Sequence, residues 1–297
     1  VALSMLLRKL AGSSPRRGAR DFHVAALQLH VSNSMADNVQ RAAALVDTAA
    51  AQGAKLVALP ECFTGKYGCD HFPSWAETVI AEAESSGGPS GAAMMRERAQ
   101  RHGIVVTGGV IEAYQGKLWN TMPVYGPEGR LLATYRKIHL SRVLGVTSES
   151  DVLTAGAAPT TFEMPGAAAM RVGMLCCFDL RFRDLLAQYG PAAGAHGPCG
   201  LLCAPSAFLR ATGTEHWDLL VQRAALDGQS YVVAPNVAYT TDDPVPLHGR
   251  SLVADPWGRI LAQCEEAGDG IALAAVDPEY VEDVRRKLPL TALAAKF

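Results

Sequence analysis

Two periodicities of apolar residues divide the chain into strands and helices. Short apolar runs bounded by Gly, Pro or Asn predict buried strands, whereas apolar positions three and four residues apart predict amphipathic helices. The strand signals fall at 22–29, 55–59, 104–111, 119–125, 130–135, 201–204, 230–237, 249–254, 259–263 and 271–276, and a central strand rises from 171. The helix signals fall at 35–52, 90–102, 182–189, 214–228 and 278–287.

Residues at the ends of these runs support the assignment. Ser34 precedes the first helix as an N-cap and Gly53 follows it as a stop. Thr214 is expected to cap the helix at 214–228. Roughly a dozen strands exceed the usual sheet of about 4–6, which favours two packed mixed sheets with helices outside. No internal linker interrupts the pattern, so residues 21–297 are expected to form a single domain.

Composition narrows the class of protein. The chain has 297 residues, is 49% hydrophobic and carries a net charge of -2. Lys and Arg do not cluster in its body, so neither nucleic acid nor a membrane surface is expected as a partner. No apolar run approaches the roughly 18 residues of a spanning helix. The seven cysteines include no CxxC pair, which argues against a disulfide framework or a structural zinc site and fits a reducing compartment.

The first 20 residues differ from the rest. They contain five Arg or Lys residues, several Ser residues and no acid, a composition that suits an organelle transit peptide. The alternative is a disordered tail. A transit peptide would place the protein in mitochondria or plastids, and a plain tail would leave it in the cytoplasm.

Three polar residues, Glu61, Lys137 and Cys177, each follow an apolar, β-rich run and begin a loop. Residues at the carboxyl ends of neighbouring strands converge on one crevice in α/β sheets. A thiol is a weak nucleophile at neutral pH, so we expect Glu61 to take its proton and Lys137 to lower its pKa and stabilise an oxyanion. Taken singly, each residue more often has a structural role: a solvated cap, a surface lysine or a buried hydrophobe.

Three segments together resemble the signature segments of the nitrilase superfamily, in that family's order and at similar separations. They are Leu59–Phe63 (LPECF), Tyr135–Leu140 (YRKIHL) and Cys177–Phe182 (CFDLRF). The likeness extends over about residues 22–290. Within the superfamily the chain looks closest to the omega-amidase branch, because Tyr-Gly and Phe-Pro pairs follow the first segment at residues 67–73.

The resemblance implies a four-layer αββα sandwich of two mixed β-sheets, assembled as a homodimer or a higher homo-oligomer. It implies a catalytic triad of Glu61, Lys137 and Cys177, with a second glutamate, Glu149, beside it. No metal or organic cofactor is implied. The substrate would be a small amide, and the omega-amidase likeness implies a short dicarboxylate monoamide such as 2-oxoglutaramate or 2-oxosuccinamate.

The motif also assigns roles around the nucleophile. It places the attacking thiol directly before the aromatic-Asp pair, which selects Cys177. Strand alternation is expected to send Cys176 to the opposite face. Asp179 and Arg181 are expected to orient the turn through an ion pair, and His139 to shape its own loop.

Several residues are candidates for contact with substrate. The candidates for the acyl pocket are Phe63, Tyr67 and Phe208. The backbone N–H of Phe178 is the candidate oxyanion donor. A free substrate carboxylate needs a cationic or hydroxyl-rich receiver, for which Arg181 and Arg210, together with Tyr67 and Thr212, are candidates.

One departure from the omega-amidase branch leaves alternatives open. The Ser141–Gly145 stretch is shorter than the corresponding loop of that branch and borders the site. The enzyme could therefore be an amidase acting on another acid, an N-carbamyl amide hydrolase or a true nitrilase. The alternative from another class is a catalytically silent binding protein.

Overall fold

A computed structural model describes residues 21–79, 89–143, 147–166, 170–240 and 245–290. The candidate transit segment, residues 1–20, lies outside the described residues, as do residues 144–146 of the short loop after Lys137.

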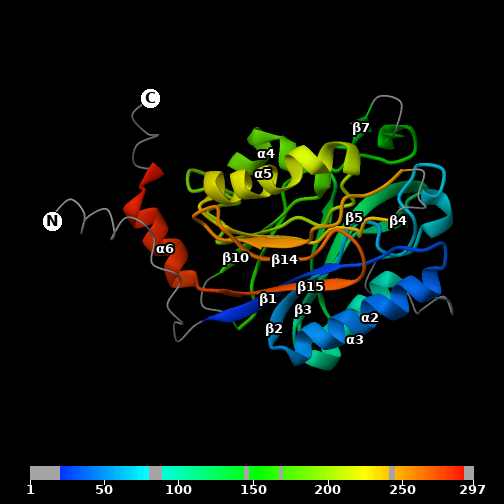
Figure 1. The fold of residues 1–297 in the computed structure, drawn as a ribbon, viewed down its shortest axis with the longest axis horizontal. Helices are drawn as coiled ribbons and strands as arrows, with labels where there is room; N and C mark the ends of the chain where they lie inside the picture. Colours follow the sequence, from blue (N-terminus) through cyan, green and yellow to red (C-terminus); the bar gives the residue numbers. More distant parts are fainter. Residues whose placement is uncertain (1–20, 80–88, 144–146, 167–169, 241–244, 291–297) are drawn as a thin grey trace.

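Two mixed β-sheets lie face to face with helices on their outer sides, a four-layer αββα arrangement that confirms the predicted fold class (Figure 1). The first sheet, in the described part of the chain, has seven strands in the order β15-β1-β2-β3-β5-β4, with β6 paired to β5. Their bounds are Phe22–Gln28 (β1), Ala54–Ala58 (β2), Val105–Thr107 (β3), Val110–Tyr114 (β4), Lys117–Tyr125 (β5), Leu131–Arg136 (β6) and Gly270–Val276 (β15).

The second sheet has six strands in the order β14-β13-β12-β11-β10-β9. Their bounds are Thr161–Glu163 (β9), Arg171–Met174 (β10), Leu201–Cys203 (β11), Tyr231–Ala234 (β12), Leu252–Ala254 (β13) and Ile260–Gln263 (β14). Two further short strands, β7 (Arg142–Val143) and β8 (Thr147–Ser148), pair only with each other among the described residues.

The helices form the two outer layers. Helices α2 (Met35–Ala51) and α3 (Gly91–His102) cover the first sheet, and α4 (Arg183–Ala187) and α5 (Arg210–Gly228) cover the second (Figure 1). Helix α6 (Pro278–Lys287) follows β15 at one end of the sandwich. None of the helices in the described ranges combines the length and the apolar composition needed to cross a membrane.

Strand β1 shows why the central strands are almost continuously apolar. Val24 and Ala26 belong to the core that also contains residues of the second sheet. Ala25 and Leu27 belong to the core shared with α2 and α3. Both faces of the strand are therefore buried, which removes the polar half of the usual alternation.

The helix ends confirm one predicted cap and correct another. Ser34 Oγ accepts a hydrogen bond from Asp37 N over 3.3 Å, as an N-cap should. The predicted cap at Thr214 is wrong: α5 begins at Arg210, and Thr214 Oγ1 donates to Arg210 O within the helix. The helix continues through Gly213. A glycine is required there because His248 packs against it: a Cβ would lie 2.4 Å from His248 Cγ.

The apolar run 104–111, predicted as one strand, is divided between β3 and β4 by Gly108 and Gly109. A Cβ on Gly109 would lie 2.6 Å from Glu61 Cα. The break therefore follows from the close passage of the Glu61 backbone, which leaves room only for a glycine.

The carboxyl ends of parallel strands from both sheets meet at one edge of the sandwich. Glu61 N, just after β2, donates to Ser206 O over 3.3 Å, and Cys177 N, after β10, donates to Pro205 O over 3.0 Å. Residues 205 and 206 follow β11, so the 205–206 backbone joins the loops of the two sheets. Residues that follow these strands are thereby placed next to one another.

Candidate active site

Three side chains from loops that follow different strands meet in one buried cluster. Glu61 follows β2, Lys137 follows β6 and Cys177 begins the turn after β10. Lys137 Nζ lies 2.8 Å from Glu61 Oε1, and the Cys177 thiol and the Glu61 carboxylate are close enough to shift each other's pKa. The structure therefore brings together the three residues that the sequence groups as a candidate triad.

Glu61 is fully buried, and its carboxylate accepts several hydrogen bonds. Asn120 Nδ2 donates to Oε1 over 2.7 Å, and the backbone N–H of Ala207 donates to Oε2 over 2.8 Å. Burial would raise the pKa of Glu61, but the Lys137 ammonium and the hydrogen-bond donors hold that pKa below its ordinary value. Glu61 therefore rests ionised, as a proton acceptor beside a thiol.

Lys137 lies between two carboxylates. Its Nζ is 2.8 Å from Glu61 Oε1 and 2.9 Å from Glu149 Oε2. Burial would lower the pKa of Lys137, but the charges of Glu149 and Glu61 raise it well above its ordinary value. The buried amine is therefore a fixed positive charge at the centre of the cluster.

Glu149 is held in turn by two donors. The backbone N–H of Ser141 donates to Oε2 over 2.6 Å, and Tyr67 Oη donates to Oε1 over 2.9 Å. Burial and the Glu149 charge raise the pKa of Tyr67 well above its usual range, so its hydroxyl stays protonated. Tyr67, a candidate for the acyl pocket, thus uses its hydroxyl to hold the second glutamate.

Cys177 occupies a strained turn. Its φ is 45°, in the left-handed region that non-glycine residues rarely adopt, and it begins a 3₁₀ turn over Cys177–Arg181. Burial and the Glu61 carboxylate raise the pKa of the thiol well above its usual range, outweighing the lowering effect of Lys137. Lys137 lowers this pKa as predicted, but burial and the Glu61 carboxylate raise it by more, so the net shift is upward.

The second thiol does not point away from the first. Cys176 Sγ donates to Glu61 Oε1 over 3.2 Å, so both thiols reach the same carboxylate. The prediction that alternation separates them is wrong, because β10 ends at Met174 and the positive φ of Cys177 breaks the extended backbone. Cys176 is a polar neighbour of the site.

Phe178 lies in the first turn of the 3₁₀ segment that starts at Cys177. Backbone N–H groups in a first turn have no acceptor within their own helix. The candidate oxyanion donor therefore lies one residue beyond the thiol.

Asp179 makes different contacts from those expected. It accepts hydrogen bonds from Tyr135 Oη over 2.6 Å and from Cys176 N over 3.0 Å. It also lies 2.7 Å from His139 Nδ1, and the His139 ring stacks on Phe182. The predicted Asp179–Arg181 ion pair is wrong: Asp179 is turned into the protein, toward the loop that follows Lys137.

Arg181 instead lies across two aromatic rings. Its Cζ is 5.0 Å from the ring centre of Phe208 and 5.8 Å from that of Phe178. Its Nη1 lies 3.2 Å from His216 Nδ1, and no described carboxylate forms an ion pair with it. Arg181 is therefore a cation without a neutralising acid in the described part of the chain, next to the Cys177 turn.

The other two candidates take structural roles. Arg210 pairs with Glu266 over 2.8 Å and lies over the Tyr239 ring, so its charge is already used. Phe63 is fully buried in the core beneath α2 and α3.

Two partners of Glu61 were not identified from the sequence. Asn120 interrupts an apolar face of β5, and a buried amide in such a strand is the one signal that would have pointed to it. Ala207 donates through its backbone N–H, a group that nearly every residue has, so its residue type does not reveal this role.

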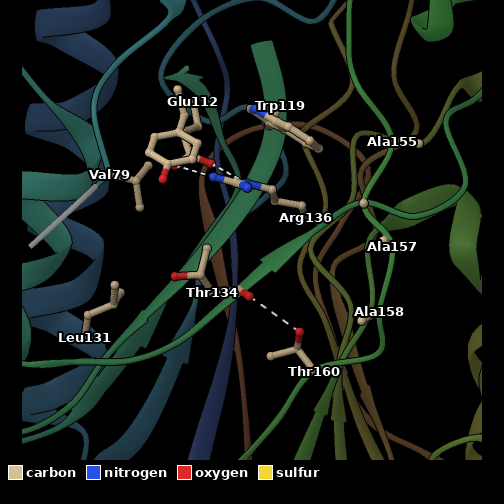
Figure 2. Close-up of a pocket in the computed structure, with 12 residues that line it drawn as sticks. Val79, Glu112, Trp119, Leu131, Thr134, Arg136, Ala155, Ala157, Ala158 and Thr160 are labelled. Carbon is tan, nitrogen blue, oxygen red and sulfur yellow. Dashed lines mark hydrogen bonds and ion pairs between the residues drawn. The ribbon is translucent and has the colours of Figure 1, made fainter. Parts of the chain in front are cut away.

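A pocket of about 540 Å³ lies beside β4, β5 and β6. Figure 2 shows Arg136 in it, paired with Glu112 and close to Trp119. The guanidinium lies 4.3 Å from the Trp119 ring centre and 4.8 Å from that of Tyr114. The charge of Arg136 is thus balanced by Glu112. None of Glu61, Lys137 and Cys177 lines this pocket.

No set of three His, Cys, Asp or Glu residues in the described ranges is arranged to hold a metal ion.

The four-layer sandwich and the Glu–Lys–Cys grouping at the ends of its strands define a hydrolase of the nitrilase superfamily. The chain belongs to the carbon-nitrogen hydrolase family, whose model matches residues 23–286. It is therefore an enzyme that hydrolyses carbon–nitrogen bonds.

Individual relatives agree with this assignment. The chain is 39% identical to the omega-amidase NIT2 of Danio rerio, over 91% of this chain and 93% of the relative. It is 38% identical to the omega-amidase NIT2 of Homo sapiens over the same shares. Among solved structures, Nit3 of Saccharomyces cerevisiae, a member of branch 10 of the nitrilase superfamily, superposes with a TM-score of 0.79, 30% identity and coverage of 94% of this chain and 98% of that chain.

Proposed function

We propose that the protein is a thiol-dependent omega-amidase with Glu61, Lys137 and Cys177 as its catalytic triad. The observation that carries the proposal is the shared carboxylate: Glu61 contacts both the Cys177 thiol and the Lys137 ammonium in a fully buried cluster. A nucleophile with its base and a fixed positive charge within reach is the minimum needed for acyl transfer.

The reaction begins when Glu61 takes the proton of Cys177 and the thiolate attacks the amide carbon. Lys137 and the backbone N–H of Phe178 stabilise the oxyanion, and one such donor is typically worth about 3–4 kcal/mol. Protonated Glu61 then gives its proton to the departing ammonia. A water deprotonated by Glu61 hydrolyses the acyl thioester, and the acid product leaves.

The Cys177 thiol must lose its proton before it can attack. The pKa of the Cys177 thiol is raised well above its usual range by burial and by Glu61, so the thiol is protonated at rest. Once the proton has moved to Glu61, that carboxylate no longer repels the thiolate, and the Lys137 charge favours it. Glu149 keeps Lys137 in place through this change.

The proposed substrate is a short dicarboxylate monoamide, such as 2-oxoglutaramate or 2-oxosuccinamate, which yields ammonia and the 2-oxo dicarboxylate. The omega-amidase relatives support this choice. So does Arg181, which has no acidic partner in the described residues and lies over Phe178 and Phe208. It is available to receive the free carboxylate of the substrate.

Ammonia release from a panel of substrates tests the proposal. We expect turnover of 2-oxoglutaramate well above that of an N-carbamyl amino acid or a simple nitrile. Preference for the nitrile or for the carbamyl compound would assign the enzyme to another activity of the superfamily. Inactivity across a wide amide panel, despite labelling of Cys177 by a thiol reagent, would favour a binding protein.

We further propose that the enzyme is a homodimer or a higher homo-oligomer. Leu219 and Leu226, two turns apart on α5, are 66% and 50% exposed, and such apolar side chains on one helix face are suited to an interface between copies. Light scattering of the wild type and of Leu219→Glu checks this; a monomeric wild-type mass contradicts it.

A further inference from the structure

Two adjacent thiols share one base in this site, although the proposed amide hydrolysis uses only one thiol. Cys176 Sγ donates to Glu61 Oε1 over 3.2 Å, and the Cys177 thiol also lies close to the Glu61 carboxylate. We propose that Cys176 is a resolving thiol: after a peroxide oxidises Cys177, Cys176 forms a disulfide with it and so keeps the oxidation reversible.

The order of events follows from exposure. Cys177 is 6% exposed and Cys176 is 0% exposed, so an incoming peroxide meets Cys177 first. Sulfenic acids proceed to irreversible sulfinic and sulfonic acids unless a second thiol captures them. Cys176 is the neighbouring residue, and its sulfur reaches the same carboxylate, so it is the thiol available for capture.

The Cys176 side chain is held in a polar setting that suits this role. Its S–H donates to Glu61 Oε1 over 3.2 Å, and its backbone carbonyl accepts the Asp179 N–H over 2.9 Å. Its own backbone N–H is fixed by Asp179 Oδ2 over 3.0 Å. The bond from its S–H to Glu61 distinguishes Cys176 from a buried cysteine that serves only as a small apolar residue.

Each chemical step balances with hydrogen peroxide as the oxidant. Glu61 takes the proton of Cys177, the thiolate attacks one peroxide oxygen, the O–O bond breaks, and the leaving hydroxide takes that proton to become water. Glu61 then takes the proton of Cys176, whose sulfur attacks the Cys177 sulfur. The S–O bond breaks and the second hydroxide also leaves as water. Two thiols and one peroxide thus give one disulfide and two waters.

The product is expected to be easily reduced. Adjacent Cα atoms are about 3.8 Å apart across a trans peptide, whereas unstrained disulfides need roughly 4.4–6.8 Å. Strained disulfides have higher reduction potentials and are the labile ones. The bond therefore protects the nucleophile during oxidation and is removed when thiol reductants return.

Peptide mass spectrometry tests the proposal directly. Trypsin should release Val172–Arg181, which contains both cysteines and no other. After brief hydrogen peroxide treatment of the whole protein, we expect this peptide to lose two hydrogens and to regain them with dithiothreitol. A peptide that gains two or three oxygens at Cys177 without losing hydrogens overturns the proposal. Fragmentation of the peptide distinguishes oxygen added to Cys177 from oxygen added to Met174.

Activity measurements provide the matched comparison. Cys176→Ser keeps a hydrogen-bond donor to Glu61 but removes the sulfur, and Cys264→Ser removes a half-buried thiol on another loop. After hydrogen peroxide treatment, we expect dithiothreitol to restore ammonia release in the wild type and in Cys264→Ser. In Cys176→Ser it should restore on the order of tenfold less of the lost activity. Equal recovery in Cys176→Ser overturns the proposal.

The peptide measurement needs only the wild-type protein, so it decides the question even where Cys176→Ser does not fold. It is also independent of the substrate. Failure of the omega-amidase assignment would therefore appear as absent ammonia release with the disulfide still formed.

Discussion

Asp179 lies 2.7 Å from His139 Nδ1, and each of these residues stands two positions after a member of the proposed triad. Asp179 also accepts the backbone N–H of His139 over 2.9 Å. The turn after Cys177 and the loop after Lys137 are thus joined by one buried carboxylate. Asp179 therefore fixes the turn that carries Cys177 relative to the loop that carries Lys137.

Replacing Asp179 with Asn should therefore both destabilise the fold and misplace the triad. The carboxylate accepts from Tyr135, from Cys176 and twice from His139, and an amide has only one oxygen for these donors. Leaving buried donors unpaired should cost about 2–5 kcal/mol of unfolding free energy. Urea unfolding measures that loss; kcat should fall in the folded protein while KM changes little, and unchanged kcat contradicts the positioning role.

Glu61→Gln should remove the proposed base with little change in shape. We expect kcat to fall by roughly 10²–10⁴-fold, the usual contribution of a general base. Lys137 keeps Glu149 as its counter-ion, so the thermal midpoint should change far less than the rate. Steady-state ammonia release and a thermal melt on the same preparation check both, and an unaffected rate would falsify the role of Glu61.

Exchanging the two thiols separately should distinguish the nucleophile from its neighbour. Cys177→Ala should reduce turnover by at least about 10⁴-fold. Cys176→Ala loses one hydrogen bond to Glu61, so its rate should stay within about tenfold of the wild type. Substantial ammonia release by Cys177→Ala would mean that Cys176 or another group attacks the substrate.

Arg181→Gln should affect charged substrates selectively. Loss of a charge-assisted hydrogen bond of about 1.5–3 kcal/mol should raise KM for 2-oxoglutaramate by roughly 10–100-fold. An uncharged amide of similar length should be turned over as before. Arg183→Gln, an exposed arginine two residues further along, is the matched control. An equal change for both substrates would remove Arg181 from carboxylate recognition.

The acid side of the pH profile should report Glu61. Its pKa in the folded protein is held below the ordinary value of 4.5, so Glu61 stays ionised as the pH falls to that value. The acid limb of kcat/KM for the free enzyme should therefore lie below pH 4.5. The same shift means that the stability contributed by ionised Glu61 is present above its unfolded pKa and is lost as the pH falls through the folded pKa. An acid limb near neutral pH would assign it to another group.

Much of the fold was predictable because buried central strands and capped helices leave local signals. Ser34 and the helix 278–287 were placed correctly from such signals. Thr214 was misplaced because its helix is extended by packing of Gly213 against His248, a contact far away in sequence.

The site was predictable only as far as residue types carry chemistry. Motifs grouped Glu61, Lys137 and Cys177, which the structure brings into one cluster. Strand alternation misled at Cys176, because a positive φ at the next residue ends the pattern. The Asp179–His139 contact and the Ala207 N–H depend on tertiary distances that no local signal contains.

The bonds of Glu61 bridge the two sheets: Asn120 and Lys137 come from the first sheet, and Ala207 and Cys176 come from the second. The partners of Glu61 on the second sheet are 115 and 146 residues away in sequence. Such contacts form late in folding, because long loops must close first. The recovery of ammonia release therefore reports that the two sheets have packed together. During refolding, ammonia release should return after far-ultraviolet circular dichroism has recovered, because each sheet alone carries only half of the partners of Glu61.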